Sequence, residues 1–430
     1  MKFALINPNW TYDGSIYFGC RHPHLPLEFG YAQALLERAG HQALILDAHL
    51  FDLSTAEVQA RIADFQPDFT VIATAPTYLF WRCPPPELRL PAAVARLLRH
   101  SGGGLLAVGP HASTTPGATI DKLGVDAVIR GEFEEILPHF ADPDWRKIPG
   151  IAFRQGKTLY QCGEPWQANL HALPPLSWPD EWLARHRHQH HRFDAQGAGS
   201  GAEIESSRGC PYRCSFCAKE NFRGLYRKRP LGVLLREIDG LLRQGVEYLY
   251  FIDEIFLPDS ALLTALASRR LRFGIQTRID LWQLEMLEAL GRAGCVSIEA
   301  GVESLSELGR QQLGKPCRLS TREISERLIF AKEHVPFVQA NLLLTDTDHP
   351  TTIAAWRKQL IAAGVWANDP VPLFPFPGSP AYRQRWGHPD DSAWERAHAW
   401  YLRRHSVFCD LQDGNPLPLE KLDRTGGVDA

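Results

Sequence analysis

Short, almost uninterrupted apolar runs alternate with helix-like patterns along roughly the first 140 residues. Runs of this length without polar alternation predict strands that are buried on both faces. Between the first two runs, Leu27 to Ala39 has its apolar residues at helical spacing. The pattern predicts a doubly wound parallel sheet, which binds ligands at the carboxyl ends of its strands. We expect its strands at Lys2 to Asn7, Ala43 to Ala48, Phe69 to Ala75, Leu105 to Gly109 and Ala127 to Arg130.

A second alternating series begins at Ala202 and predicts a partial parallel barrel of six strand–helix units. Its chemistry is again expected at the carboxyl ends of the strands. We expect strands at Ala202 to Ser206, Tyr248 to Asp253, Phe273 to Ile279, Val296 to Ala300, Val338 to Thr345 and Val371 to Phe374. We expect helices at Leu231 to Arg243, Ser260 to Arg269, Leu281 to Arg292, Thr321 to His334 and Thr351 to Ala363.

These patterns predict an α/β protein with four segments. Residues 1–140 form the doubly wound sheet, and residues 141–201 form a hairpin, Ile151 to Cys162, with a His-rich connector. Residues 202–380 form the partial barrel, and residues 381–430 form a helical extension that covers the pocket or binds a partner.

Composition narrows the class of protein further. The chain has 430 residues, of which 44% are apolar and 22% charged, which are ordinary globular values. The net charge of −3 gives no overall field for nucleic acid, so no nucleic-acid partner is expected. The N-terminus lacks a secretory pattern and no apolar run reaches membrane-spanning length, so we expect a cytoplasmic protein.

Nine cysteines are scattered along the chain, and three of them form one tight cluster, Cys210, Cys214 and Cys217. An odd, scattered set is poor for disulfides and suits a metal site. Structural zinc generally takes four protein ligands, and no fourth cysteine or histidine follows at finger spacing. Three thiolates on a four-iron cluster leave one iron open for a small molecule. Core thiols, or a zinc site completed from elsewhere in the chain, remain the alternatives.

The sequence around these cysteines resembles the radical S-adenosylmethionine (SAM) superfamily over most of Glu203 to Tyr382. The resemblance implies that SAM binds the open iron and that one electron, from a donor such as flavodoxin or ferredoxin, cleaves it to a 5'-deoxyadenosyl radical. Besides the cysteines, it rests on four segments in the expected order: Tyr250 to Phe256, Gln276 to Arg278, Ile298 to Ser304 with Leu313 to Lys315, and Pro375 to Pro380.

The resemblance also implies roles in SAM binding. Phe216 offers a flat apolar face to adenine, although an aromatic residue beside a cluster is also ordinary packing. Asp253 and Glu254, at a strand end, accept hydrogen bonds from the SAM ammonium, and Arg278 pairs with its carboxylate. The alternative for these charged residues is a salt bridge between neighbouring strands.

Two further acidic positions have open roles. Glu299 and Glu303 are assigned to the SAM ribose, or one of them caps the helix near Ser304. The segment Leu344 to Pro350 replaces the Gly- and Pro-containing turn of relatives. Its two acids and histidine either orient a polar substrate or make an Asp-rich turn and N-cap the following helix. The tract His186 to His191 is interpreted as a solvated connector, with metal binding as the alternative.

The first domain resembles the cobalamin-binding domain that precedes many radical SAM barrels. The resemblance implies base-off cobalamin contacted by Gly109, His111, Gly131 and Glu132, with the Gly-Glu turn starting a helix.

Two histidine-containing segments are candidates for a cobalt ligand. Asp47 to Asp52 imitates a cobalt-ligating signature but follows the wrong strand, and we interpret it as a surface turn. The loop with Cys20, His22 and His24 is interpreted as a cover for the corrin, with a histidine ligand to cobalt as the alternative.

Two cofactors in one chain suit methylation of an unactivated carbon, because cobalamin carries a methyl group that a substrate radical can accept. We therefore expect a C-methyltransferase acting on a small molecule or lipid. A radical cyclisation or rearrangement is the first alternative, and an idle cobalamin sensor or carrier is the second. A methylthiotransferase should bring additional cluster cysteines, but the first domain has only Cys20 and Cys83. The substrate and the catalytic residues are not predicted.

Overall fold

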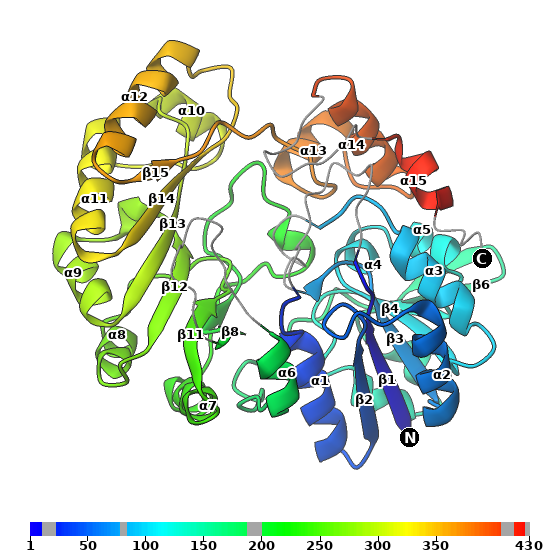
Figure 1. Cartoon of the computed structure of the whole chain (residues 1–430). Coiled ribbons are helices and arrows are strands. Elements are labelled where there is room, and N and C mark those ends of the chain that lie inside the picture. The colour runs from blue at the N-terminus through cyan, green and yellow to red at the C-terminus, as the bar shows by residue number, and fades with distance from the viewer. Residues whose placement is uncertain (11–22, 78–83, 187–199, 406–416, 426–430) are drawn as a thin grey trace. The chain divides into compact units, whose positions relative to one another are not determined.

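The computed structural model describes residues 1–10, 23–77, 84–186, 200–405 and 417–425 (Figure 1). Backbone contacts divide the chain into two compact units, each described by itself below. The first unit contains residues 1–176, 216–224 and 374–430, and the second contains residues 177–215 and 225–373. The chain thus returns to the first unit for one short segment immediately after Ser215.

The first unit is built on a seven-stranded sheet with the order β2-β1-β3-β4-β5-β6-β7. All five strands predicted here are present and parallel, each ending within two residues of the prediction. The strands are β1 (Lys2–Asn7), β2 (Gln42–Asp47), β3 (Phe69–Ala73), β4 (Gly104–Val108), β5 (Ala127–Ile129), β6 (Ile151–Gln155) and β7 (Thr158–Gln161).

The strand order reverses at β1, so the carboxyl ends of β1 and β3 form the topological switch point where such sheets bind ligands. One helix follows β1, and three helices on the other side of the sheet pack side by side (Figure 1). This arrangement is the predicted doubly wound fold. The helices are α1 (Leu27–Arg38), α2 (Thr55–Phe65), α3 (Arg89–Leu98), the short α4 (Pro110–Thr114) and α5 (Pro116–Leu123).

The predicted hairpin forms, but it also extends this sheet. β6 pairs antiparallel with β5 and with β7, so the sheet is mixed and not purely parallel. The residues between β5 and β6 form only two short 3-10 helices, η2 (Leu137–Ala141) and η3 (Trp145–Lys147). Without a crossover helix, the chain reverses direction at the edge of the sheet.

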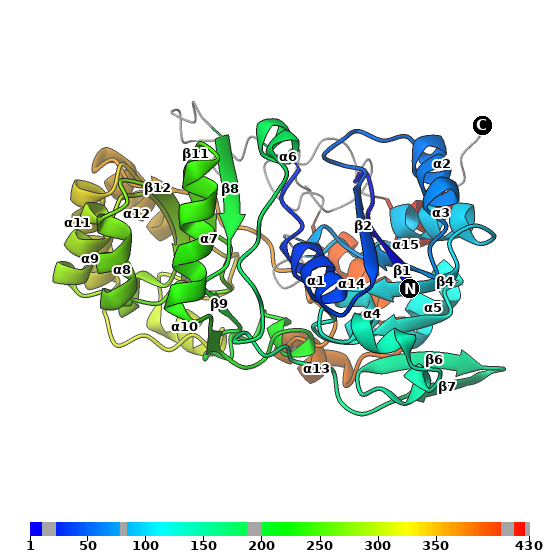
Figure 2. The ribbon, with the colours of Figure 1, turned by 90° about the horizontal axis from the view of Figure 1, so that it is seen from below.

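The second unit contains six parallel strands in the order β15-β14-β13-β12-β11-β8. Because this order follows the chain, right-handed crossovers place the connecting helices on one face (Figure 2). The strands are β8 (Ser200–Ile204), β11 (Val246–Phe251), β12 (Arg272–Thr277), β13 (Cys295–Glu303), β14 (Phe337–Leu342) and β15 (Trp366–Ala367). The helices are α7 (Leu231–Arg243), α8 (Ser260–Ala267), α9 (Leu284–Arg292), α10 (Glu307–Gln312), α11 (Thr321–His334) and α12 (Pro350–Ala362).

The position predicted for the sixth strand is wrong. The strand is β15, and only Val371 of the predicted run joins the sheet, through hydrogen bonds of 3.0 Å to the Leu342 carbonyl and 2.9 Å from the Leu344 N–H. Pro370 and Pro372 flank it and have no N–H to donate, so the ladder cannot continue.

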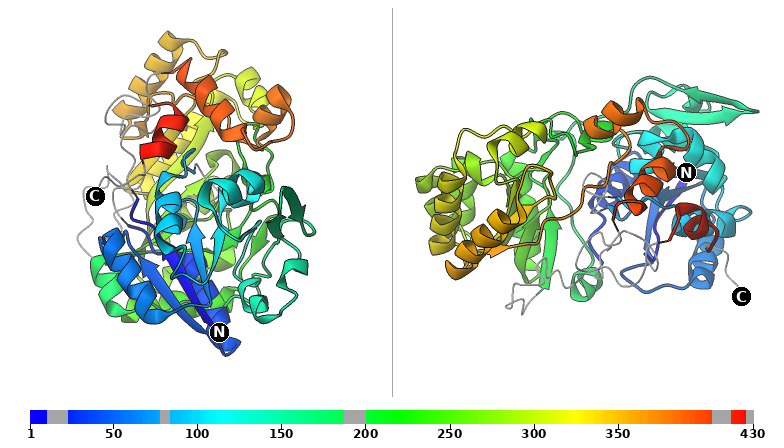
Figure 3. Two further views of the ribbon diagram at one scale, coloured as in Figure 1. Left: turned by 90° about the vertical axis from the view of Figure 1, so that its right-hand side faces the viewer. Right: turned by 90° about the horizontal axis from the view of Figure 1, so that it is seen from above.

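Three C-terminal helices pack in the first unit (Figure 3). Asp391 accepts a hydrogen bond of 3.0 Å from the Ala118 N–H, and Glu395 pairs with Lys122. The helices are α13 (Pro380–Trp386), α14 (Ala393–Leu402) and α15 (Leu419–Thr425). Among the described helices, none combines the length and apolar character needed to cross a membrane.

Candidate functional site

The cysteine-rich loop begins at a short antiparallel ladder after β8. β9 (Ser207–Arg208) pairs with β10 (Arg227–Lys228), and Gly209 follows with φ +78°. A Cβ on Gly209 would lie 2.0 Å from the Leu225 carbonyl oxygen, so only glycine fits here. The three thiols of Cys210, Cys214 and Cys217 are half-buried and free of disulfides.

The segment Leu313 to Lys315, part of the fourth barrel motif, contacts the same loop. The Ser215 N–H donates to the Leu313 carbonyl at 2.8 Å. Gly314 has φ +61°, and a Cβ there would lie 2.8 Å from the Arg213 carbonyl oxygen and 3.6 Å from the Cys214 Cα. The turn predicted from sequence similarity therefore packs directly against the cysteine loop.

Two cations influence the Cys214 thiol. Burial raises its pKa, while the nearby Lys315 and Arg278 act in the opposite direction. The Lys315 Nζ donates to the Gly301 carbonyl at 2.7 Å and to Glu303 Oε1 at 2.8 Å. Glu303, expected at the SAM ribose, is thus engaged with Lys315. Sequence reasoning quoted Lys315 as part of a motif but gave it no role.

Arg278 is a buried guanidinium with bonding capacity left. It makes two hydrogen bonds to Asp280, at 3.1 and 2.8 Å, and lies 4.3 Å over the Tyr212 ring. A third donor reaches the Pro316 carbonyl at 2.9 Å. The carboxylate that pairs with Arg278 is therefore on its own loop, at Asp280, and not on a neighbouring strand. Nη1 is buried and has no hydrogen-bond partner among the described residues, which suits an anionic ligand.

Asp253 and Glu254 follow β11 and contact the start of the cysteine loop. Asp253 is fully buried and accepts hydrogen bonds from Ser206 and Ser207. Burial raises its pKa to about 7, although these hydrogen bonds act in the opposite direction. Glu254 accepts the Gly209 N–H at 2.9 Å. Both carboxylates therefore contact the loop.

The remaining residues predicted to bind SAM are half-buried. Glu299 lies on β13, and Phe216 lies in the segment that belongs to the first unit. The suggestion that Glu299 or Glu303 caps the next helix is wrong, because Ser306 caps α10 and accepts the Gly309 N–H at 3.0 Å.

His111 lies in α4, immediately after β4, and is fully engaged by packing. Its Nε2 lies 2.8 Å from the Pro85 carbonyl, and its ring stacks on Trp394 with centroids 4.0 Å apart. Burial lowers its pKa to about 3, so the imidazole is neutral. Gly109, which precedes the helix, has φ +107°, a backbone conformation that favours glycine.

The predicted helix after Gly131-Glu132 is absent from the described residues there; a turn and then η2 follow. Gly131 has φ +82°, and a Cβ on it would lie 2.2 Å from the Trp166 carbonyl oxygen. The Glu132 N–H donates to that carbonyl at 2.9 Å, and its buried carboxylate accepts the Ala168 N–H. The backbone approach at this glycine is therefore to the chain itself.

Asp47 to Asp52 forms the predicted turn, but the turn is not a surface feature at its start. Asp47 is buried and accepts hydrogen bonds of 3.0 Å from Asn7 Nδ2 and 2.9 Å from the Leu50 N–H. Cys20 and His22 lie outside the described residues, whereas His24 lies within them and is half-buried.

In the Asp346 to Pro350 segment, the helix-cap interpretation is confirmed. His349 caps α12, and Asp348 accepts the Ser306 N–H at 2.9 Å.

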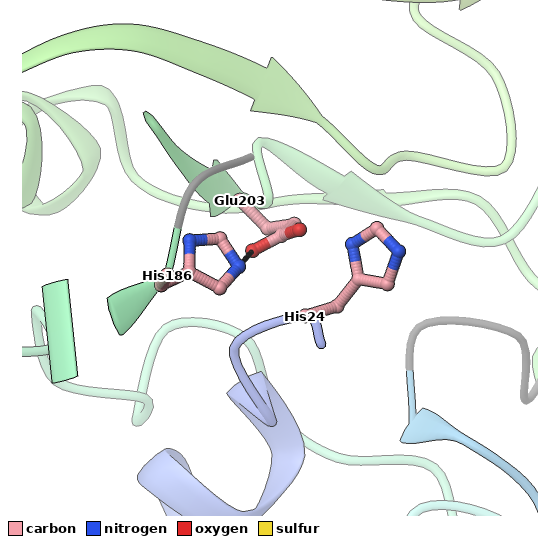
Figure 4. Close-up of side chains that lie close together, drawn as sticks. All are labelled: His24, His186 and Glu203. Atoms are coloured by element: carbon pink, nitrogen blue, oxygen red, sulfur yellow. Dashed lines mark ion pairs between the residues drawn. The ribbon is translucent and has the colours of Figure 1, made fainter. Parts of the chain in front are cut away.

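The His tract departs from its prediction at its first residue. His186 is buried, with Nδ1 2.8 Å from the Gly201 carbonyl and Nε2 2.9 Å from Glu203 (Figure 4). The interpretation as solvated connector is therefore wrong for His186, because both ring nitrogens have buried partners. Residues 187–191 lie outside the described residues.

A sequence comparison now bears on this arrangement. The family model described as the radical SAM superfamily matches residues 204–354. This chain contains a radical SAM domain. The matched region runs from the end of β8 to α12, and it includes the cysteine loop and the strands that carry Asp253, Arg278 and Glu303.

Individual proteins resemble the chain beyond the radical SAM domain. An uncharacterised methyltransferase of Pyrococcus horikoshii is 24% identical over 73% of this chain and 68% of its own length. An anaerobic magnesium-protoporphyrin IX monomethyl ester cyclase of Cereibacter sphaeroides is 24% identical over 87% of this chain and 63% of its own length. The chain thus spans about two thirds of these relatives.

Solved structures share the fold. The radical SAM methyltransferase TsrM of Kitasatospora setae, solved with cobalamin and a 4Fe–4S cluster, has a TM-score of 0.69 at 19% identity and covers 88% of this chain and 76% of its own. The predicted α/β fold class and the predicted resemblance to cobalamin-dependent radical SAM enzymes are confirmed, and with them the prediction of an enzyme.

Proposed function

We propose that this radical SAM enzyme binds a 4Fe–4S cluster, SAM and cobalamin, and methylates an unactivated carbon of a small molecule or lipid. The observation that carries the proposal is the cysteine loop. Its three thiols are free of disulfides, and burial raises the pKa of the Cys214 thiol while two buried cations, Lys315 and Arg278, oppose that rise. Thiolates are the ligands that iron–sulfur clusters require.

Residues of the cysteine loop and of the second unit suit these groups. Cys210, Cys214 and Cys217 would hold the cluster, and Arg278, with its unsatisfied Nη1, would pair with the SAM carboxylate. Glu299, Glu303 and Phe216 remain candidates for the rest of SAM. With all cofactors bound, the chemistry supplied is a carbon-centred radical and a transferable methyl group. An electron donor such as flavodoxin or ferredoxin is part of the proposal.

In the first unit, the topology of the sheet supports cobalamin binding better than the predicted contact residues do. The switch point between β1 and β3 suits a large ligand, and TsrM, which shares the fold, was solved with cobalamin. Gly109 keeps its proposed role, whereas the described contacts of His111, Gly131 and Glu132 are internal. We propose base-off binding with no protein histidine below the metal.

The experiment is anaerobic reconstitution followed by turnover with SAM carrying a labelled methyl group. Candidate substrates come from comparing metabolites and lipids of cells with and without the gene for mass differences of one methylene. The proposal expects 5'-deoxyadenosine and label in the product. A product without label, formed with SAM consumption, would replace methylation by a rearrangement.

Such a rearrangement is the second candidate, and the name of the cyclase relative favours it. An idle sensor or carrier predicts no SAM cleavage at all.

A further inference from the structure

The Asp253 carboxylate holds two consecutive residues at the base of the cysteine loop. Its Oδ1 accepts the N–H groups of Ser206, at 2.9 Å, and Ser207, and also the Ser207 hydroxyl at 3.0 Å. Its Oδ2 accepts the Ser206 hydroxyl at 2.8 Å. Asp253 thus bonds to four donors, all from the two residues that connect β8 to the loop.

The neighbouring contacts extend this anchor to the first cysteine. Glu254 accepts the N–H of Gly209, the residue before Cys210. On the other side of the chain, the Arg229 N–H donates to the Ser206 carbonyl at 2.9 Å, next to the β9–β10 ladder. The direction in which the chain enters the loop is therefore set by Asp253, Glu254 and this ladder together.

The number of donors bears on the role of Asp253. A carboxylate has about four acceptor sites, two on each oxygen, and here three donors crowd Oδ1 while one bonds to Oδ2. Burying such a group is costly unless it is well hydrogen-bonded, so these donors account for its burial. Asp253 is also fully buried, so a SAM ammonium could reach its carboxylate only if neighbouring residues moved aside.

We propose that Asp253 is a positioning residue, which holds the cluster-binding loop through Ser206 and Ser207 and does not bind the SAM ammonium. The inference rests on the proposed function in one respect, namely that the loop holds a cluster.

The test compares Asp253→Asn, the double variant Ser206→Ala/Ser207→Ala and the triple variant that combines them. All are reconstituted anaerobically as full-length holoenzyme. The rate of iron release to a chelator and the change that SAM causes in the electron paramagnetic resonance spectrum of the reduced cluster are measured. Asp239→Asn is the matched control, because Asp239 forms a partly exposed ion pair with Arg269 in the same unit.

A positioning role expects faster iron release, by about tenfold, in Asp253→Asn and in the serine variant. The triple variant should release iron no faster than Asp253→Asn, because the two hydroxyl contacts that the serine changes remove are among the contacts that Asp253→Asn already weakens. The SAM-induced spectral change should persist in all of them, and the control should match wild type.

Normal iron release together with a lost SAM-induced change would overturn the inference and make Asp253 a SAM ligand. Additive effects in the triple variant would also overturn it. If Asp253→Asn does not fold, the serine variant decides, since faster iron release in it supports the role and an unchanged rate refutes it. Wild-type protein that takes up no iron would instead contradict the proposed function.

Discussion

The predicted cofactor residues of the two units differ in what the fold leaves available. In the second unit, the thiols of Cys210 and Cys214 form no disulfides, and Arg278 retains a buried nitrogen with no hydrogen-bond partner among the described residues. In the first unit, His111 is enclosed by Pro85 and Trp394, and Glu132 bonds to the chain at Ala168. Sequence motifs of similar quality thus identified residues that are available to a ligand in one unit and residues that are engaged in internal contacts in the other.

The cause is the sequence distance of the partners. In the second unit the motifs lie at the ends of adjacent parallel strands. The register of β12 and β13 alone therefore places Arg278 and Glu299 near the same edge of the sheet. In the first unit the partners lie far away in sequence, such as Trp394 for His111. A sequence motif therefore predicts which edge of the sheet a residue lies at. The role of its side chain depends on the residues that pack against it.

The largest effect is expected from Cys214→Ala. Removal of one of three thiolates should abolish SAM cleavage and lower the iron content. Formation of 5'-deoxyadenosine, measured by chromatography with mass detection, checks this. Cys162→Ala is the control, because Cys162 is also a half-buried thiol in no disulfide but lies outside the cysteine cluster. Full activity in Cys214→Ala would show that this thiol is not needed for SAM cleavage. The proposed contrast between the cofactor residues of the two units would then no longer hold.

Arg223→Met should cost about 3–5 kcal/mol in the free energy of unfolding. Arg223 is fully buried in the first unit, with its guanidinium 2.8 Å from Glu28 and 3.6 Å from Glu132, and its loss leaves carboxylates without their cation. Urea unfolding measures the change. Lys122→Met, which breaks a partly exposed pair with Glu395, should cost at most about 1 kcal/mol. Equal losses in both variants would contradict the special role of the buried Arg223 cluster.

Arg278→Met should weaken SAM binding by about 10- to 100-fold, since hydrogen bonds to charged groups contribute about 1.5–3 kcal/mol. The iron content should remain that of wild type. Calorimetric titration of reconstituted enzyme with SAM gives the affinity. Arg272→Met is the control at the start of β12, the strand that leads to Arg278, because Arg272 pairs with Glu247 at an exposed position. Unchanged affinity in Arg278→Met would make Arg278 a structural residue, like those of the first unit.

The smallest effect concerns pH and His111. Burial lowers its folded-state pKa to about 3, so the unfolded chain binds more protons between about pH 3 and about pH 6.5. The contribution of neutral His111 to stability is therefore complete above about pH 6.5 and decreases as the pH falls. His111→Gln does not titrate, so its deficit relative to wild type should shrink toward acid pH. Urea unfolding at about pH 5 and about pH 7 checks this. A constant deficit would show that His111 titrates normally.

The sequence alone determined the five parallel strands of the first sheet and most of the second sheet. It also predicted the bounds of α7 and α11 and the position of the cysteine loop. These features follow from local patterns, because apolar runs of strand length, helical spacing and three close cysteines each express their physics within a few residues.

Tertiary structure alone decided which side chains remain available for chemistry. The donors to Asp253 come from 46 and 47 residues earlier in the chain, and the carboxylate that binds Arg223 comes from 195 residues earlier. The antiparallel edge of the first sheet and the packing of the C-terminal helices near α5 likewise depend on tertiary contacts. A buried polar group must find a partner wherever the chain brings one near, and that partner is fixed by packing and not by spacing along the sequence.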